Sequence, residues 1–240
     1  MEKKNIIFIG PGKSGTTYVY NLLKRNNYDV GTIKESNYFF RSSNYWGLYN
    51  KEYKNRIIDF SNTYFWNPNI ALKINEKYDS FILVVLKRDP YDRLASHLNY
   101  LISRGEINGD WQHYLKNNRD MLLSLSFNWY LSIWQEYFKG RIEVLEFNDL
   151  KDQSTLSQRL QELGLNVVDW DVDKYNTKLI GGTVYTRSLF SFGRLLKKCI
   201  PNRAVGFLKT WVEPLVIKTF AKRGETVKIS REDVIAYLHG

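Results

Sequence analysis

The chain has 240 residues, of which 43% are hydrophobic and 25% are charged, and it carries a net charge of +10. This length and hydrophobic content fit one packed α/β domain over residues 1–240 and exclude a disordered chain. The sequence has no apolar run near the roughly 18 residues of a membrane span, no signal-like N-terminus and one cysteine, Cys199, which predicts a cytoplasmic protein without disulfides. The basic charge favours anionic partners, but nucleic acid, anionic lipid, a nucleotide and an acidic glycan all satisfy it.

A glycine-rich turn near the N-terminus separates a predicted strand from a predicted helix. Residues 5–9 form a short apolar run typical of a buried strand, which residues 10–12 end with the sequence Gly-Pro-Gly. Apolar residues then recur at helical spacing in residues 15–27. A strand, a glycine-rich turn and a helix together direct backbone N–H groups at an anion. Lys13 adds a positive charge to this turn, and Ser14, Thr16 and Thr17 add hydroxyl donors.

The order of residues in this turn distinguishes between two kinds of phosphate loop. An ATP- or GTP-binding loop has its lysine directly after the second glycine, whereas here Thr16 follows Gly15 and the lysine precedes it. The order Lys-Ser-Gly-Thr-Thr instead resembles the phosphosulfate loop of the sulfotransferases that use 3′-phosphoadenosine 5′-phosphosulfate (PAPS). The resemblance implies that this cofactor is bound by Lys13, Ser14, Gly15, Thr16 and Thr17. The alternative is an ordinary strand–helix turn with a solvated lysine.

The rest of the chain alternates between predicted strands and helices. Strands are expected at residues 29–33, 57–60, 81–86 and 142–147, and helices at residues 45–55, 68–78, 124–138 and 149–163, with a further helix starting at Pro90. This alternation predicts a P-loop-like three-layer α/β fold with a central, mostly parallel sheet, followed by a helical C-terminal region. Ligands bind at the carboxyl ends of such strands, where Lys13, Glu35, Ser61 and Arg88 are expected.

The stretch from Arg88 to Ser96 resembles the sulfotransferase segment that binds the 3′-phosphate of the cofactor. In that segment an Arg and a Ser stand at this spacing, so the resemblance implies that Arg88 and Ser96 bind the 3′-phosphate. Arg supplies a rigid fork of donors suited to phosphate oxygens. The alternative is a basic helix start in which Arg93 pairs with Asp89 or Asp92.

Residues 34–40 resemble the Lys-Glu-x-His-aromatic-Phe segment of the glycan-directed branch, which contains the heparan-type sulfotransferases and their bacterial relatives. The resemblance implies that Glu35 is the catalytic base and that the acceptor is a carbohydrate. Lys34 would orient Glu35 or offset charge on the transferring group. Asn37 stands where the pattern has histidine. The alternative for Lys34 and Glu35 is an exposed ion pair that contributes little to stability. Residues 59–65 resemble the segment near the acceptor, and the lack of its lysine suggests an acceptor less acidic than heparan.

The resemblance covers residues 4–165 as a nucleotide-binding core, and residues 177–240 form a basic part with apolar faces at helical spacing. Such a part is either a membrane-surface or partner-binding element or a solvated helical cap. Arg187-Ser188 resembles a pair that closes over the cofactor, so Arg187 is a further candidate for cofactor binding.

Two rival functions remain open on the sequence. The first is a P-loop kinase of a small metabolite, which would need ATP and Mg²⁺; the second is a non-catalytic binder of nucleic acid or anionic glycan. We expect no nucleic-acid partner because the anion-binding residues gather at strand ends. The three histidines, His97, His113 and His239, have no metal-ligand spacing. The resemblance implies a transfer that needs no metal, so we expect none.

Overall fold

The computed structural model describes residues 5–31, 34–40, 57–77, 81–104, 106–107, 109–170 and 228–240. Internal contacts divide the chain into two compact units, Met1–Arg93 with Leu123–Asn176 and Leu94–Leu122 with Thr177–Gly240. The first unit contains the whole sheet. The single domain over residues 1–240 stays a prediction, and so do the helix at residues 45–55 and most of the C-terminal part, which lie outside the described residues.

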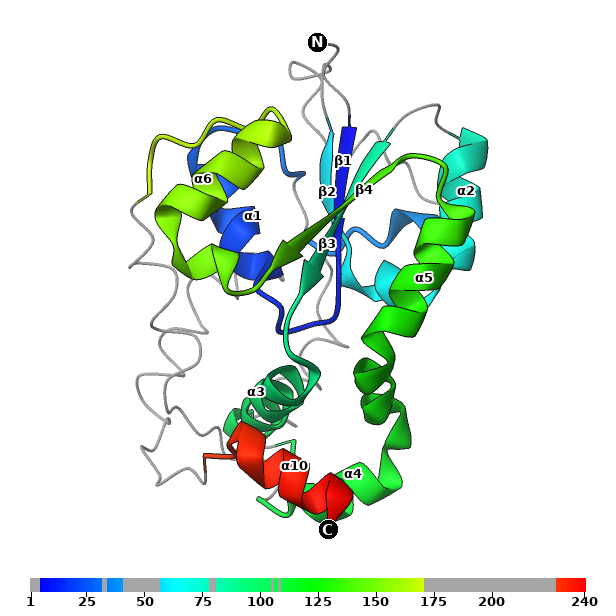
Figure 1. Ribbon diagram of the computed structural model, residues 1–240, viewed down its shortest axis with the longest axis vertical. Helices are drawn as coiled ribbons and strands as arrows, with labels where there is room; N and C mark the ends of the chain where they lie inside the picture. The colour runs from blue at the N-terminus through cyan, green and yellow to red at the C-terminus, as the bar shows by residue number, and fades with distance from the viewer. Residues whose placement is uncertain are drawn as a thin grey trace, which may run out of the picture. The chain divides into compact units, whose positions relative to one another are not determined.

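Four parallel strands form the sheet of the first unit (Figure 1). In chain order they are β1 (Asn5–Ile9), β2 (Ile58–Phe60), β3 (Phe81–Lys87) and β4 (Arg141–Glu146). Their order in the sheet is β2-β1-β3-β4. The chain therefore leaves β1 toward one side to form β2 and then returns to form β3 on the other side. The carboxyl ends of β1 and β3 thus meet at a topological switch point, where open α/β sheets bind ligands.

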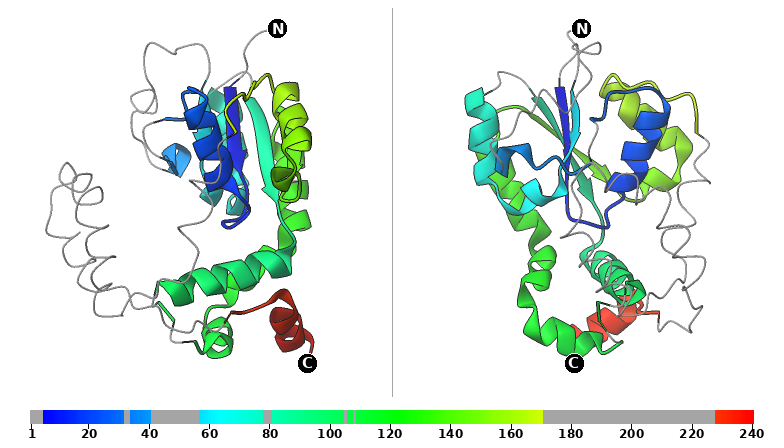
Figure 2. Two further views of the ribbon diagram at one scale, coloured as in Figure 1. Left: turned by 90° about the vertical axis from the view of Figure 1, so that its left-hand side faces the viewer. Right: turned by 180° about the vertical axis from the view of Figure 1, so that it is seen from behind.

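Helices cover both faces of this sheet (Figures 1 and 2). On one face lie α1 (Thr16–Arg25) and α6 (Gln153–Glu162), and on the other lie α2 (Asn69–Lys77) and α5 (Phe127–Tyr137). Side chains along β1 alternate between the two cores, with Ile6 and Phe8 in the first and Ile7 and Ile9 in the second. The predicted three-layer parallel fold is therefore confirmed.

The predicted strand at residues 29–33 is wrong over its described part. Residues 29–31 have no regular secondary structure; the Gly31 N–H donates to Asp29 Oδ1 at 3.2 Å, and Gly31 has a φ of 76°. An aspartate side chain that bonds the backbone two residues on, followed by a glycine at positive φ, favours a turn over a strand.

Two predicted helices are shorter than expected because each begins as a tighter 3₁₀ helix. Arg119–Ser126 and Asp149–Lys151 are 3₁₀ helices that precede α5 and α6. Asp152 caps α6 by accepting a hydrogen bond from the Ser154 N–H at 3.1 Å. Two more 3₁₀ helices, Tyr38–Phe40 and Asn62–Trp66, flank the gap between residues 40 and 57 and lie near β2.

The helix α3 (Pro90–Ser103) starts with proline, as predicted, and continues from the first unit into the second. The second unit also contains α4 (Trp111–Asn117) and α10 (Arg231–His239). Asn99 on α3 exchanges two hydrogen bonds with the backbone of Ile229, at 2.8 and 2.9 Å. The ring of Tyr237 on α10 packs edge-on against Trp111, and its hydroxyl donates to the Gln112 carbonyl at 3.1 Å. The C-terminal helix is thus fixed to α3 and α4.

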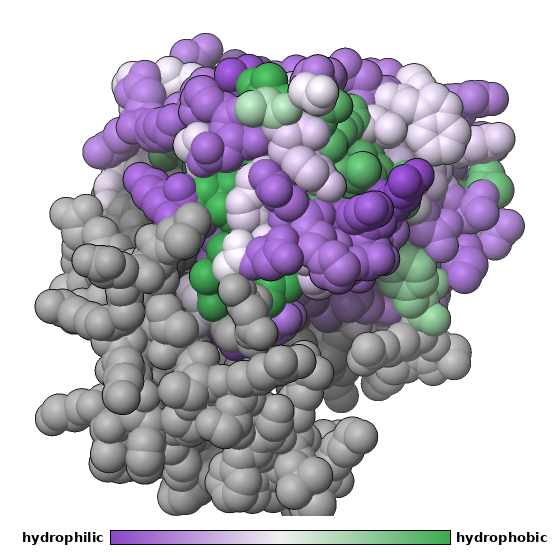
Figure 3. Space-filling model, turned by 90° about the horizontal axis from the view of Figure 1, so that it is seen from below, coloured by the Kyte–Doolittle hydropathy of each residue, from purple (hydrophilic) through white to green (hydrophobic). Residues whose placement is uncertain are grey.

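None of the helices in the described part of the chain is both long enough and apolar enough to cross a membrane. Figure 3 shows one side of the molecule, where hydrophilic side chains cover most of the coloured surface and apolar ones form small patches between them. Scattered exposed apolar side chains of this kind are ordinary for a folded protein.

At the end of β1, the effect of a Gly→Ala substitution on stability should depend strongly on its position. Gly10 has a φ of 141°, and a Cβ there would lie 2.5 Å from the backbone oxygen of Leu86 on β3. Gly10→Ala should therefore lower the free energy of unfolding by more than about 1 kcal/mol. Gly12→Ala is the matched control, because a Cβ at Gly12 meets nothing within 4 Å, and its effect should stay within about 0.5 kcal/mol. Urea denaturation measures both values, and equal effects would contradict the close approach.

Candidate functional site

The turn after β1 presents the start of α1 without a side-chain cap. Gly15 occupies the N-cap position at a φ of 93°, and no side chain of the described residues bonds there. A Cβ on Gly15 would clash with the side chain of Leu150, so the turn packs closely on the chain after β4. Thr16 and Thr17 begin the helix, and the exposed Thr17 reaches solvent. An uncapped helix start provides N–H donors and the positive end of the helix dipole to an anion.

Lys13 and Ser14 in this turn have the features of a binding loop. Lys13 has a φ of 71°, a conformation that costs a non-glycine residue on the order of 1–3 kcal/mol and is concentrated at functional sites. Ser14 is fully buried, yet its hydroxyl has no hydrogen-bond partner in the described part of the chain. Buried hydroxyls are normally paired. The orphaned Ser14 hydroxyl and the uncapped helix start therefore fit the oxygens of a bound phosphosulfate.

Glu35 lies beside this turn because the end of β2 fixes it there. Its backbone N–H donates to the Phe60 carbonyl at 2.8 Å, and its Oε2 accepts from the Asn62 N–H at 2.7 Å. The Asn62 side chain in turn donates from Nδ2 to Thr16 Oγ1 at 2.9 Å. Asn62 thus connects the carboxylate of Glu35 to the first residue of α1. Lys34 Nζ lies 2.7 Å from Glu35 Oε1, and both side chains are mostly buried, with exposures of 21% and 30%.

A buried aspartate supports the segment that carries Glu35. Asp59 on β2 is 1% exposed and accepts hydrogen bonds from the hydroxyls of Ser36, at 3.0 Å, and Ser61, at 3.2 Å. The Asn37 N–H donates to Ser61 Oγ at 3.2 Å. Burial raises the pKa of Asp59 to about 6, although the two hydroxyls lower it and the charge of Glu35 adds to the rise. Since Glu35 and Asn37 both have positive φ values, of 62° and 49°, these bonds stabilise a strained turn.

Arg88, directly after β3, and Arg93, on α3, approach carbonyl groups of the same loop. Arg88 Nη1 donates to the Lys13 carbonyl at 2.9 Å, and its guanidinium stacks 4.3 Å from the Phe147 ring centroid. Arg93 Nη1 lies 3.5 Å from the Gly12 carbonyl. Burial lowers the pKa of Arg88, while the charges of Asp92 and Asp89 oppose this. The loop, Arg88 and Arg93 therefore meet at the switch point between β1 and β3.

Two predicted cofactor residues are not placed with this group. Ser96 lies on α3 in the second unit, and its role at the site stays a prediction. Arg187 lies outside the described residues. The structure thus brings together Lys13, Ser14, Gly15, Thr16, Thr17, Lys34, Glu35 and Arg88.

Three residues have a place in the site that the sequence did not predict. Asn62 lies in the segment that resembles the acceptor region. Arg93 was expected to pair with Asp89 or Asp92, but in the described ranges it forms no ion pair. Asp59 was assigned to the acceptor region, yet its carboxylate points to Ser36 and Ser61. A polar residue inside an apolar strand, as in Ile-Asp-Phe, was the available signal for Asp59.

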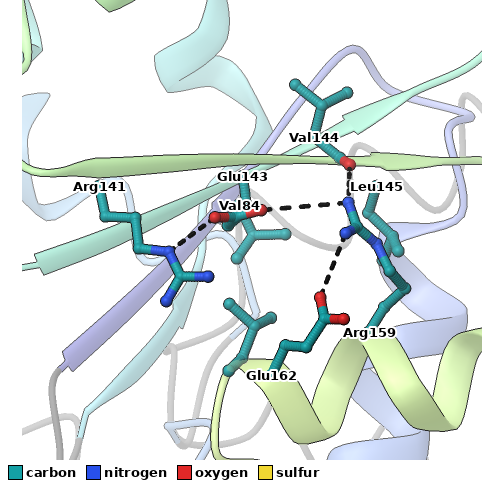
Figure 4. A pocket seen from close by; sticks show the side chains of 8 residues that line it. Val84, Arg141, Glu143, Val144, Leu145, Arg159 and Glu162 are labelled. Carbon is teal, nitrogen blue, oxygen red and sulfur yellow. Dashed lines mark hydrogen bonds and ion pairs between the residues drawn. The ribbon is translucent and has the colours of Figure 1, made fainter.

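No group of three or more His, Cys, Asp or Glu side chains in the described ranges is arranged to hold a metal ion. A pocket elsewhere in the first unit contains none of the predicted site residues (Figure 4). It lies between β4 and α6, where Arg141 and Arg159 already pair with Glu143 and Glu162. Because its charges neutralise one another, this pocket is not a comparable anion site.

Comparison with protein-family models finds no match, and no curated protein matches the sequence. Among solved structures, the crystal structure of a sulfotransferase from Alicyclobacillus acidocaldarius superposes with a TM-score of 0.54 and 14% identity, over 70% of this chain and 85% of that chain. The fold of this chain therefore resembles that of the bacterial sulfotransferase.

Two further structures are similar at lower scores. The sulfotransferase domain from the curacin biosynthetic pathway gives a TM-score of 0.41 and 17% identity, over 77% of this chain and 82% of that one. Mouse sulfotransferase SULT7A1, complexed with 3′-phosphoadenosine 5′-phosphate (PAP), gives a TM-score of 0.44 and 18% identity, over 72% of this chain and 63% of that one. At these identities the likeness concerns the fold, so the function has to be argued from the chain's own residues.

Asp59 should make the stability of the protein depend on pH. Its pKa of about 6 in the folded chain exceeds its ordinary value of 3.8, so the folded state holds the proton more tightly than the unfolded state. This stabilising contribution is complete below pH 3.8 and is lost as the pH rises through about 6, a change on the order of 3 kcal/mol. Asp59→Asn should remove that loss.

Urea denaturation of the wild type and Asp59→Asn between pH 3.8 and about 6 measures the difference. Glu136→Gln, which changes an exposed carboxylate on α5, is the control and should keep the wild-type pH profile. Parallel profiles for Asp59→Asn and the wild type would show that Asp59 does not titrate in this range.

Proposed function

We propose that this protein is a sulfotransferase that moves a sulfuryl group from PAPS to a hydroxyl of a carbohydrate acceptor. One observation carries the proposal: the uncapped loop, Arg88 and Glu35 converge at the switch point between β1 and β3. A phosphate cradle, a phosphate-binding fork and a carboxylate base are the three groups that such a transfer needs.

The loop would hold the phosphosulfate end of the cofactor. The backbone N–H groups of residues 14–17 and the hydroxyls of Ser14, Thr16 and Thr17 provide donors, and Lys13 places its charge beside them. PAPS, when bound, supplies a sulfuryl group already activated by its link to phosphate. Lys13 would stabilise negative charge on the leaving oxygen, and preorganised stabilisation of this kind is usually the largest contribution to catalysis. Arg88 and Ser96 would bind the 3′-phosphate, and Arg187 would close over the cofactor.

Glu35 would take the proton from the acceptor hydroxyl as the bond to sulfur forms. Its Oε2 is fixed by the Asn62 N–H and its Oε1 by Lys34 Nζ, each at 2.7 Å. Because Asn62 also bonds Thr16, the base and the loop have a defined separation. The two contacts orient the carboxylate of Glu35, and a general base has to be positioned in this way.

The carbohydrate acceptor is proposed from the segment around Lys34 and Glu35, whose pattern resembles the glycan-directed branch. The cytoplasmic location and the peripheral membrane contact of the basic C-terminal part are proposed from the sequence alone. A P-loop kinase would need the loop lysine next to the second glycine, and here Lys13 precedes Gly15. A passive anion binder would not need the strained, clamped conformation of Glu35.

The first test is calorimetric binding of the product nucleotide, 3′-phosphoadenosine 5′-phosphate (PAP). We expect binding that depends on the 3′-phosphate, so adenosine 5′-phosphate should bind much more weakly. Arg88→Ala should lower the affinity for PAP by about 10- to 100-fold, the usual range for a charge-assisted hydrogen bond. Arg141→Ala, at an exposed arginine of β4, is the control. Preference for ATP with Mg²⁺ over PAP would replace the sulfotransferase with the kinase.

The second test concerns Glu35 and uses transfer of labelled sulfate from PAPS to a panel of oligosaccharides. Glu35→Gln keeps the size of the side chain and its acceptor for the Asn62 N–H but removes the base. The turnover rate should fall by about 10²- to 10⁴-fold while PAP affinity stays the same. Glu76→Gln, an exposed residue on α2, should have wild-type activity. Full turnover by Glu35→Gln would exclude Glu35 as the base.

A further inference from the structure

Arg93 is a buried cation without a countercharge in the described part of the chain. Arg93 is only 4% exposed, and no carboxylate in the described ranges pairs with its guanidinium group. Asp89, four residues earlier, instead caps α3, accepting from the N–H groups of Tyr91 and Asp92 at 3.1 and 2.9 Å. Buried arginines are almost always paired, because desolvation of an ion is costly.

The contacts that Arg93 does make are too weak to offset this cost. Its Nη1 lies 3.5 Å from the Gly12 carbonyl, at the outer limit of a hydrogen bond, and its Nε is buried without a partner. Burial and the positive charge of Arg88 lower the pKa of Arg93 to about 10. Arg88 Nε is likewise buried without a partner. Two guanidinium groups therefore repel each other beside one loop.

We propose that Arg93 binds the cofactor directly and shares its 3′-phosphate with Arg88. A phosphate monoester carries about −1.5 to −2 charges at neutral pH, which matches two guanidinium groups, whereas each group of a phosphosulfate carries one. Both arginines have a free Nε, and the arginine fork suits phosphate oxygens. The proposal rests on the proposed function and adds a residue that makes the site selective for nucleotides with a 3′-phosphate.

A ligand-binding Arg93 and a structural Arg93 predict opposite changes in the stability of the ligand-free protein when the residue is replaced. Removal of an unpaired buried charge should leave the ligand-free protein as stable as before or more stable. Removal of an arginine that holds the loop through Gly12 should destabilise it. Ligand binding and ligand-free stability therefore change in opposite directions only if Arg93 is a ligand.

The experiment uses Arg93→Met, which keeps an extended apolar side chain, and Arg93→Lys, which keeps the charge but not the fork. Urea denaturation without ligand should give Arg93→Met a midpoint equal to or above that of the wild type. Calorimetry should show PAP affinity falling by about 10- to 100-fold in Arg93→Met, with an intermediate loss in Arg93→Lys. Affinity for adenosine 5′-phosphate should change little. Arg141→Met, which removes an exposed charge of the same unit, should change neither the urea midpoint nor the affinity for PAP.

The outcomes separate this inference from the proposed function. If PAP binds the wild type and Arg93→Met equally well, Arg93 is not a ligand, and the sulfotransferase proposal stands. A lower midpoint with equal losses for PAP and adenosine 5′-phosphate would make Arg93 structural. If the wild type prefers pyrophosphate or ATP to PAP and Arg93→Met loses that binding, the anion-binding role stands, but its assignment to a 3′-phosphate falls with the sulfotransferase. If the wild type binds none of these anions, both proposals are overturned.

Discussion

The close approach of the backbones of β1 and β3 is the constraint on which the site depends. At Gly10 the chain leaves β1 directly against the Leu86 carbonyl, with no room for a side chain. Because β2 lies on the other side of β1, the chain also reverses its winding direction here. The loop after β1 and the arginines after β3 are consequently placed within hydrogen-bonding distance of each other. Open α/β sheets bind ligands at such a switch point whatever side chains line it.

A second constraint fixes the position of Glu35 relative to that loop. The segment that carries Glu35 has no regular structure and contains two non-glycine residues at positive φ. The end of β2 supports it through the Phe60 carbonyl, the Asn62 N–H and the Asp59–Ser61 pair. The free energy stored in the turn is thus balanced by hydrogen bonds from a rigid strand. A carboxylate held in this way keeps its position when a ligand binds beside it.

The sequence predicted the layers of the fold and the order of most elements, because their signals are local. Apolar runs at residues 5–9 and 81–86 and helical spacing after Gly15 needed no tertiary information. The irregular segment at residues 29–31 was missed because the apolar Val30 outweighed the short-range preference of Asp29 and Gly31. The roles of Asn62 and Arg93 depend on contacts across 46 and 81 positions of the chain. Such contacts follow from the sheet order, which the alternation of elements alone does not determine.

The charges at the switch point show a conflict between stability and binding. Arg93 is buried close to the half-buried Arg88, and the hydroxyl of Ser14 and the Nε groups of both arginines have no partners among the described residues. Each of these features lowers the stability of the ligand-free protein, and none is explained by packing. All of them lie around one loop, whose own lysine has a strained backbone. A cluster of unsatisfied donors with one sign of charge is stabilised by an anion that binds only the folded state. The features that favour an anion at this site are therefore the same features that lower the stability of the ligand-free protein.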